Sequence, residues 1–267
     1  MANPILNDNT WNKAAHNPGW GAPDPATRAT PITDGPVSAW HSQVMTVGGT
    51  LSAAGVLMVV LLAAAVVGWQ TLPDSSVGGF PPLALVGVVV GFACAIAMYF
   101  RPMWAKFLAP TYALAEGYFV GVISHAYDNA YKGIVVQAIG ATLGVFAVML
   151  VLYRTKVIKV TDRFRRIIIT ATMGLMAFYL VSFVISLIAG SGAVSFINSP
   201  SALGILFSVF AAGLAAMNLA IDFDFIERGA KQGLPKGMEW FAAFALVVTL
   251  VWLYLELLRL LSKLQRR

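Results

Sequence analysis

Apolar residues occur along this chain in long continuous blocks separated by short polar connections. A helix needs roughly 20 apolar residues to cross about 30 Å of hydrocarbon, and seven blocks reach or nearly reach that length. Because the blocks are continuous and do not alternate with a period of two, they predict helices rather than the strands of a barrel. They cover approximately residues 43–69, 82–100, 107–126, 133–153, 166–189, 201–222 and 239–261.

Glycine and proline punctuate the connections, as expected where helices end. The third block is the weakest by hydropathy, because it contains Pro110, Glu116 and Gly117. We still predict seven spans. The breakers that separate the first two spans are Pro73, Gly78, Gly79, Pro81 and Pro82, and those before the sixth are Gly190, Ser191, Gly192 and Pro200.

The first 41 residues contain no apolar block and are rich in Pro, Gly, Asn and Trp. Such a composition predicts a mostly disordered tail, in which Trp11, Trp20 and Trp40 could contact the membrane interface. No cleavable signal peptide is visible, so we expect the first helix to act as an uncleaved signal anchor. The chain is therefore divided into a polar cytoplasmic tail, 1–41, and a seven-helix transmembrane domain, 42–264.

Composition supports a membrane protein, because 58% of the residues are hydrophobic and only 11% are charged. Soluble domains carry about 25% charged residues, so most of this surface must face lipid. The net charge of +6 does not indicate nucleic-acid binding, because the basic residues lie in connections and form no patch interleaved with exposed aromatics. The expected partner is the lipid bilayer.

Lysine and arginine residues are distributed unevenly between the two sides of the predicted spans. Thirteen lie in the tail and the even-numbered connections, and only Lys132 lies in the odd-numbered ones, so the positive-inside rule predicts a cytoplasmic N-terminus. The thirteen are Lys13, Arg28, Arg101, Lys106, Arg154, Lys156, Lys159, Arg163, Arg165, Arg166, Arg228, Lys231 and Lys236.

The C-terminal end opposes this rule, because seven spans place its basic residues outside. Either packing fixes a central last helix, or that helix re-enters the membrane and the tail returns to the cytoplasm. We favour seven spans, because residues 240–258 contain no break. The residues in question are Arg259, Lys263, Arg266 and Arg267.

Acidic residues inside membrane spans are costly and therefore have a partner or a function. Glu116 lies near the centre of the third span. It is a candidate proton-responsive or cation-contacting group that faces the interior of the bundle. The alternative is a protonated Glu that donates a hydrogen bond to a backbone carbonyl or a hydroxyl.

Asp222, near the end of the sixth span, is a second candidate. Residues two apart point about 200° apart on a helix, so Asp222 and Asp224 do not share a face. Asp222 shares one with Asn218 and with the small residues Ala211 and Ala215, which suit close helix packing. We therefore expect Asp222 to face inward, with an interfacial cap or a surface ion pair as the alternative.

Other charged residues fit the edge of the membrane. We expect Asp224 to lie at the interface near Arg228 and Lys231. Arg101 closes the second span, where it could be a snorkelling anchor or a partner for Asp222 at the same depth.

On the seventh span, Thr249, Trp252 and Glu256 fall on one stripe. Glu256 precedes Arg259 by three residues, and an ordinary helical ion pair is its favoured interpretation.

Enzyme signatures are missing from the sequence. There is no H-E-x-x-H, G-x-S-x-G, Walker or dinucleotide-binding motif, and His16, His41 and His125 are far apart. Cys94 is the only cysteine, which excludes an intrachain disulfide and a Cys-based metal site. We therefore expect no enzymatic activity, no cofactor and no fixed metal site. An intramembrane hydrolase lacks a nucleophile–base constellation.

Three segments carry a resemblance to a known family: Pro110-Thr-Tyr-Ala-Leu-Ala-Glu-Gly117 with Gly121-Val-Ile-Ser124, Met217-Asn-Leu-Ala-Ile-Asp-Phe-Asp-Phe-Ile-Glu227, and Leu250-Val-Trp-Leu-Tyr-Leu-Glu-Leu-Leu-Arg259. With them the chain resembles the Bax inhibitor-1 family, the transmembrane Bax inhibitor motif proteins, in a bacterial branch, over about residues 43–263. The resemblance implies six helices around a central seventh. It also implies a pH-sensitive leak of calcium or other cations, associated in eukaryotes with suppression of cell death.

The resemblance further implies a latch in which two aspartates, on the sixth and seventh helices, sense protons. An arginine at the end of the second helix engages the first aspartate in the closed state. Asp222 and Arg101 occupy these places, but Thr249 stands where the second aspartate is expected. Asp222 could gate with Arg101 alone, or Glu116 could supply the second acid.

The leading hypothesis is a calcium or other cation leak in a bacterial plasma (inner) membrane, with transient calcium binding near Asp222. The alternative is a non-conducting regulator of membrane proteases or stress signalling, which acts on membrane protein partners through the 41-residue tail. The gate and proton-sensing candidates are Asp222, Arg101 and Glu116, and the polar residues that could line an ion path are Asn218, Thr249, Asp224 and Glu256.

Overall fold

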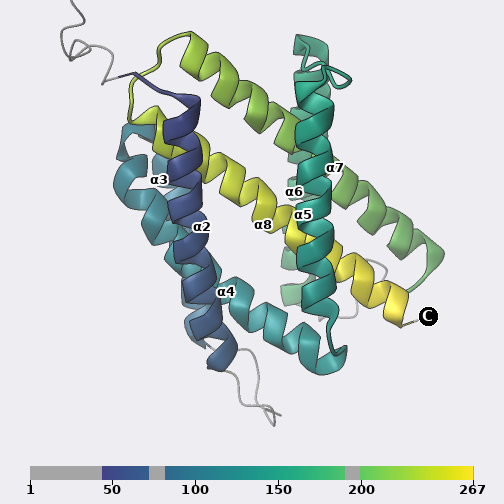
Figure 1. The fold of residues 1–267 in the computed structure, drawn as a ribbon. Coiled ribbons are helices and arrows are strands. Elements are labelled where there is room, and N and C mark those ends of the chain that lie inside the picture. Colours follow the sequence, from purple (N-terminus) through teal and green to yellow (C-terminus); the bar gives the residue numbers. More distant parts are fainter. Residues whose placement is uncertain (1–43, 72–81, 190–198, 267) are drawn as a thin grey trace, which may run out of the picture. The chain divides into compact units, whose positions relative to one another are not determined.

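The computed structural model describes residues 44–71, 82–189 and 199–266, and these residues form an all-helical unit without strands (Figure 1). The predictions for residues 1–41 lie outside the described residues. The helices are α2 (Val47–Gln70), α3 (Pro82–Phe100), the short 3₁₀ helix η3 (Pro102–Trp104), α4 (Ala105–Ala130), α5 (Ile134–Arg154), α6 (Asp162–Ala189), α7 (Ala202–Lys231) and α8 (Met238–Gln265).

Seven α-helices therefore stand where the seven apolar blocks predict them. Six of these described helices are long and apolar enough to cross a membrane, all but α4. The polar residues within α4, such as Glu116, lower its hydropathy without interrupting the helix, and Pro110 lies in its second turn. The fold class, an all-α integral membrane protein, is confirmed, and the chain is a multi-pass membrane protein.

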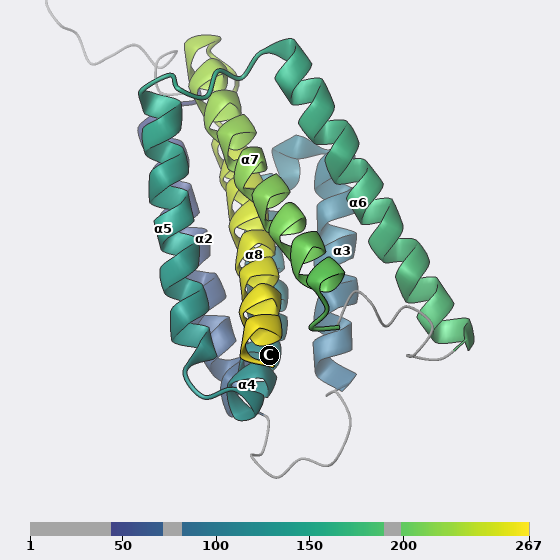
Figure 2. The same cartoon turned by 90° about the vertical axis from the view of Figure 1, so that its right-hand side faces the viewer.

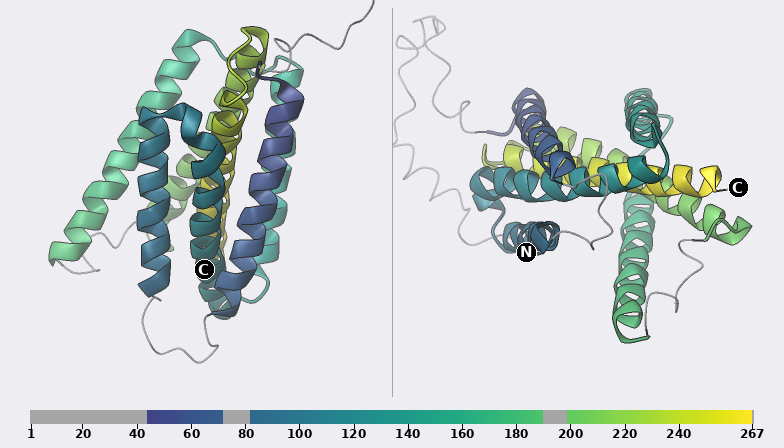
Figure 3. Two further views of the ribbon diagram at one scale, coloured as in Figure 1. Left: turned by 90° about the vertical axis from the view of Figure 1, so that its left-hand side faces the viewer. Right: turned by 90° about the horizontal axis from the view of Figure 1, so that it is seen from below.

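The last helix, α8, is the centre of the described unit. It contacts α2, α4, α5 and α7 as well as η3, and it runs alongside α7 (Figure 2). Seen from below, α2 and α5 lie on one side of α8, and α3 and α6 lie on the other (Figure 3). In the apolar stretch of α8, 67% of the residues are buried inside the protein. The corresponding share in α6, which lies at the edge, is 11%. The prediction of a central seventh helix is confirmed.

Helices α2 and α4 approach closely because glycines remove side chains from their contact. A Cβ at Gly117 would overlap the carbonyl oxygen of Leu61, and a Cβ at Gly121 would overlap that of Ala65. Gly87 on α3 also lies close to α4, since a Cβ there would come within 2.9 Å of a backbone oxygen of α4. Small residues that allow such approaches are typical of helix packing in membranes.

Successive helices run antiparallel, so their termini gather at two ends of the unit. We call the end with Arg101, where α3, α5 and α7 finish, the Arg101 end. The opposite end, where α2, α4, α6 and α8 finish, is the Lys263 end. At the Arg101 end, the backbone N–H of Met45 donates to the carbonyl of Leu234 at 2.6 Å. Glu239 accepts bonds from the N–H and hydroxyl of Thr46, 2.9 Å each, and so joins the first turns of α2 and α8.

Candidate functional site

Asp222 on α7 faces Thr249 on α8. The Thr249 side chain lies beside the Asp222 carboxylate, and the Thr249 hydroxyl donates to the carbonyl of Ala245 at 3.1 Å. Oδ2 of Asp222 is buried and has no hydrogen-bond partner among the described residues. The structure therefore brings together the two positions that the family resemblance aligns with a pair of aspartates.

The neighbours of Asp222 along α7 explain its inward direction. Ala211 and Ala215 on the same stripe are fully buried, and Asn218 donates to the Thr172 hydroxyl of α6 at 2.8 Å. Small side chains on this stripe let α7 approach its neighbours closely. Asn218 is therefore a contact between α6 and α7, one turn from Asp222.

Arg101 does not engage Asp222 in this structure. It ends α3 and precedes η3, its side chain is exposed, and within the described residues it forms no ion pair with any acid. The proposed Asp222–Arg101 contact is thus not formed in this state.

Asp224 lies at the Arg101 end and already has two cationic partners. It forms ion pairs with Arg165 of α6, at 2.6 Å, and with Arg228 one turn further along α7. The sequence predicts that Asp224 lies near Arg228, because the two residues are four positions apart on one helix. It does not predict Arg165, because that contact joins residues 59 positions apart. Through its ion pairs with Arg165 and Arg228, Asp224 connects α6 to α7.

Glu116 occupies a different interface from Asp222. Its Oε2 lies against Gly91 of α3, where an added Cβ would come within 3.3 Å of it. It forms no ion pair with the described residues. Since Asp222 faces α8, the structure does not bring the two acids together.

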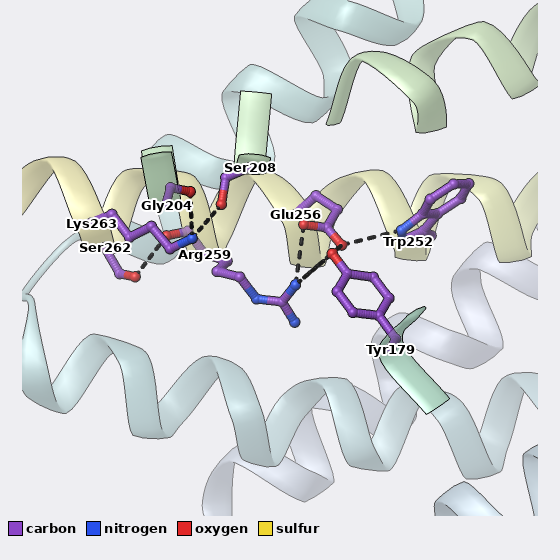
Figure 4. Close-up of polar contacts among 8 residues, drawn as sticks. All are labelled: Tyr179, Gly204, Ser208, Trp252, Glu256, Arg259, Ser262 and Lys263. Carbon is purple, nitrogen blue, oxygen red and sulfur yellow. Dashed lines mark hydrogen bonds and ion pairs between the residues drawn. The ribbon is translucent and has the colours of Figure 1, made fainter. Parts of the chain in front are cut away.

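Glu256 is almost fully buried at 2% exposure and is surrounded by donors (Figure 4). Arg259 Nη1 lies 3.2 Å from both carboxylate oxygens, so the helical ion pair that the spacing predicts is present. The Tyr179 hydroxyl of α6 donates at 2.8 Å, and the Trp252 indole N–H donates at 3.3 Å. Arg259 also donates to the Tyr179 hydroxyl at 3.0 Å.

Lys263 is a functional-site candidate that the sequence does not reveal. Its side chain is 1% exposed, and its ammonium donates to the carbonyl of Gly204 at 2.8 Å and to the Ser208 hydroxyl at 2.6 Å (Figure 4). A lysine in the last turn of a final helix has the pattern of a solvated tail. Only the spacing of Glu256, Arg259 and Lys263 along one face of α8 could have indicated burial.

No group of three or more His, Cys, Asp or Glu side chains within the described residues could hold a metal ion. Comparison with protein families gives a match over residues 3–266 to the family model described as Bax inhibitor 1 like. Comparison with curated proteins gives no match.

Proposed function

This chain belongs to the Bax inhibitor 1 like family, and from that premise we propose that it provides a pH-sensitive leak for calcium or other cations. We place it in a bacterial plasma membrane with its N-terminus in the cytoplasm and assign it no enzymatic activity. The observation that carries the proposal is the buried, unpartnered Oδ2 of Asp222 at the contact between α7 and the central helix α8. Intramembrane acids of this kind mark ion and proton pathways.

The proposed gate has two parts. Ionised Asp222 attracts Arg101 and so draws the end of α3 onto α7, which closes the path. Protonation removes that attraction and releases Arg101, and the exposed side chain of Arg101 supports such a released arrangement. Glu116, at the interface of α3 and α4, is proposed as a second protonatable group on the helix pair that moves.

Calcium flux into proteoliposomes that contain the purified full chain tests this function. Wild type should leak more at low than at high pH, and Asp222→Asn should leak equally at both, because its side chain is neutral throughout. Arg101→Gln should behave like Asp222→Asn. The exposed acid Asp162 provides a matched control, and Asp162→Asn should retain the pH dependence of wild type. Absence of calcium flux from wild type at every pH would refute the proposal and favour the non-conducting regulator.

A further inference from the structure

A polar hollow of about 350 Å³ opens at the Lys263 end of the unit, away from Asp222. Its walls come from α4 and α8, and none of the described acidic side chains lines it. The lining residues are Tyr127, Arg259, Ser262, Lys263 and Arg266. Three cationic side chains therefore surround one cavity.

The charge around this hollow is not balanced. Glu256 neutralises Arg259, whereas the partners of the other two cations are neutral. Lys263 donates to a carbonyl and a hydroxyl, and Arg266 Nε donates to the Tyr131 hydroxyl at 2.6 Å. Asp128 of α4, an acid at the same end, lies 3.9 Å from Lys132. Among the described residues, an excess of positive charge therefore remains in the hollow.

Several donors in the hollow also lack acceptors. Within the described residues, Nη2 of Arg259 and both terminal nitrogens of Arg266 make no hydrogen bond or ion pair. Two of the three N–H groups of the Lys263 ammonium are occupied, so one has no acceptor among the described residues. Guanidinium groups present forked donors that match the oxygens of a phosphate group.

We propose that this hollow binds a phosphate group, and that the group belongs to the headgroup of a phospholipid. The hollow lies at the end of membrane-spanning helices, which is the depth of the headgroups. Basic pockets between transmembrane helices suit such headgroups. A free phosphate ion would satisfy the same donors, so the test distinguishes the two sources. Lipid bound here would join the last turn of α8 to α4.

Native mass spectrometry of the detergent-solubilised full chain, titrated separately with phosphatidylglycerol and with diacylglycerol, tests the site. We expect wild type to retain one phosphatidylglycerol and no diacylglycerol, which lacks the phosphate. Because Arg266 is exposed at the helix end, Arg266→Gln should fold normally and bind phosphatidylglycerol about tenfold more weakly, as expected for a lost charge-assisted bond. Arg259→Gln should weaken binding as well.

Lys132 supplies the matched control, because it is an exposed cation at the same end and does not line the hollow. Lys132→Gln should bind like wild type. Inorganic phosphate alone, measured by the shift in thermal unfolding, identifies the source. A shift in wild type that Arg266→Gln abolishes would support the phosphate site and assign it to the free ion. Equal binding of phosphatidylglycerol by wild type and Arg266→Gln, or equal retention of diacylglycerol, would overturn the proposal.

Discussion

The Thr249 hydroxyl of α8 lies beside the carboxylate of Asp222 on α7. The family resemblance implies a second aspartate at the position of Thr249, so this chain has one acid where a pair is expected. A hydroxyl can donate to an ionised carboxylate or accept from a protonated one. Thr249 therefore accommodates both states of Asp222 without adding a charge.

Replacement of Thr249 by Asp should restore a carboxyl pair at this contact. Two adjacent carboxyl groups share a proton and titrate in two coupled steps. The pH dependence of calcium flux in Thr249→Asp proteoliposomes should therefore broaden relative to that of wild type. Asn has nearly the same shape as Asp but carries no charge. Thr249→Asn should therefore keep the wild-type pH dependence of calcium flux. Equal profiles in the Asp and Asn variants would show that the second acid does not couple to Asp222.

Asp224 should contribute to stability through its two cationic partners. Asp224→Asn leaves Arg165 and Arg228 without their shared acid at a partly buried site. We expect the free energy of unfolding to fall by about 1–2 kcal/mol, measured as a lower melting temperature of the detergent-solubilised protein. Lys231→Gln, which breaks the exposed Glu227–Lys231 pair, should cost less than about 0.5 kcal/mol. Equal effects of the two changes would contradict the assigned role.

The close approach of α2 and α4 makes Gly121 intolerant of a side chain. Gly121→Ala would force the added methyl group against the Ala65 carbonyl, and overpacking of this kind costs about 1–3 kcal/mol. At Gly144 on α5, an added Cβ would meet no atom within 4 Å. Gly144→Ala should therefore leave the melting temperature unchanged or raise it. The comparison fails if both alanines have the same effect.

The Glu256 cluster links the central helix to α6. Glu256→Gln leaves the Arg259 guanidinium without its carboxylate, which should cost about 2–4 kcal/mol. Tyr179→Phe removes the hydroxyl that bridges both groups and should cost about 1 kcal/mol. Because the residues form one network, the double variant should lose less stability than the two single changes together. Additive losses in thermal unfolding would show that Tyr179 acts independently.

Hydropathy predicts the number and order of the helices but not where each one ends. The sixth block is expected to finish near residue 222, yet α7 continues to Lys231. Its last turns contain the pairs Asp224–Arg228 and Glu227–Lys231, which stabilise a helix at a spacing of four residues. The same charges lower the apolar signal, so the pattern that marks a membrane span stops before the helix does.

The sequence predicts those features of the site that depend only on the spacing of residues along one helix. Helical spacing predicts the inward face of Asp222 and the pairing of Glu256 with Arg259. Contacts between distant helices, such as Lys263 with Gly204 and Ser208, depend on how the helices pack, and a single sequence contains no signal for this. The structure does not pair Asp222 with Arg101, and residue types alone do not determine which side chains of distant helices meet.

The basic C-terminal end should lie outside the cytoplasm despite its charges. Lys263 is buried, Arg259 is paired with Glu256, and Arg266 is bound to Tyr131, so contacts within the protein offset the cost of placing them there. Alkaline phosphatase fused after residue 267 should be active, and green fluorescent protein fused there should be dark. On a Cys94→Ser background, an impermeant maleimide should label Lys132→Cys in intact cells and Lys159→Cys only after permeabilisation. A fluorescent C-terminal fusion with Lys132→Cys labelled would mean that α8 does not span the membrane.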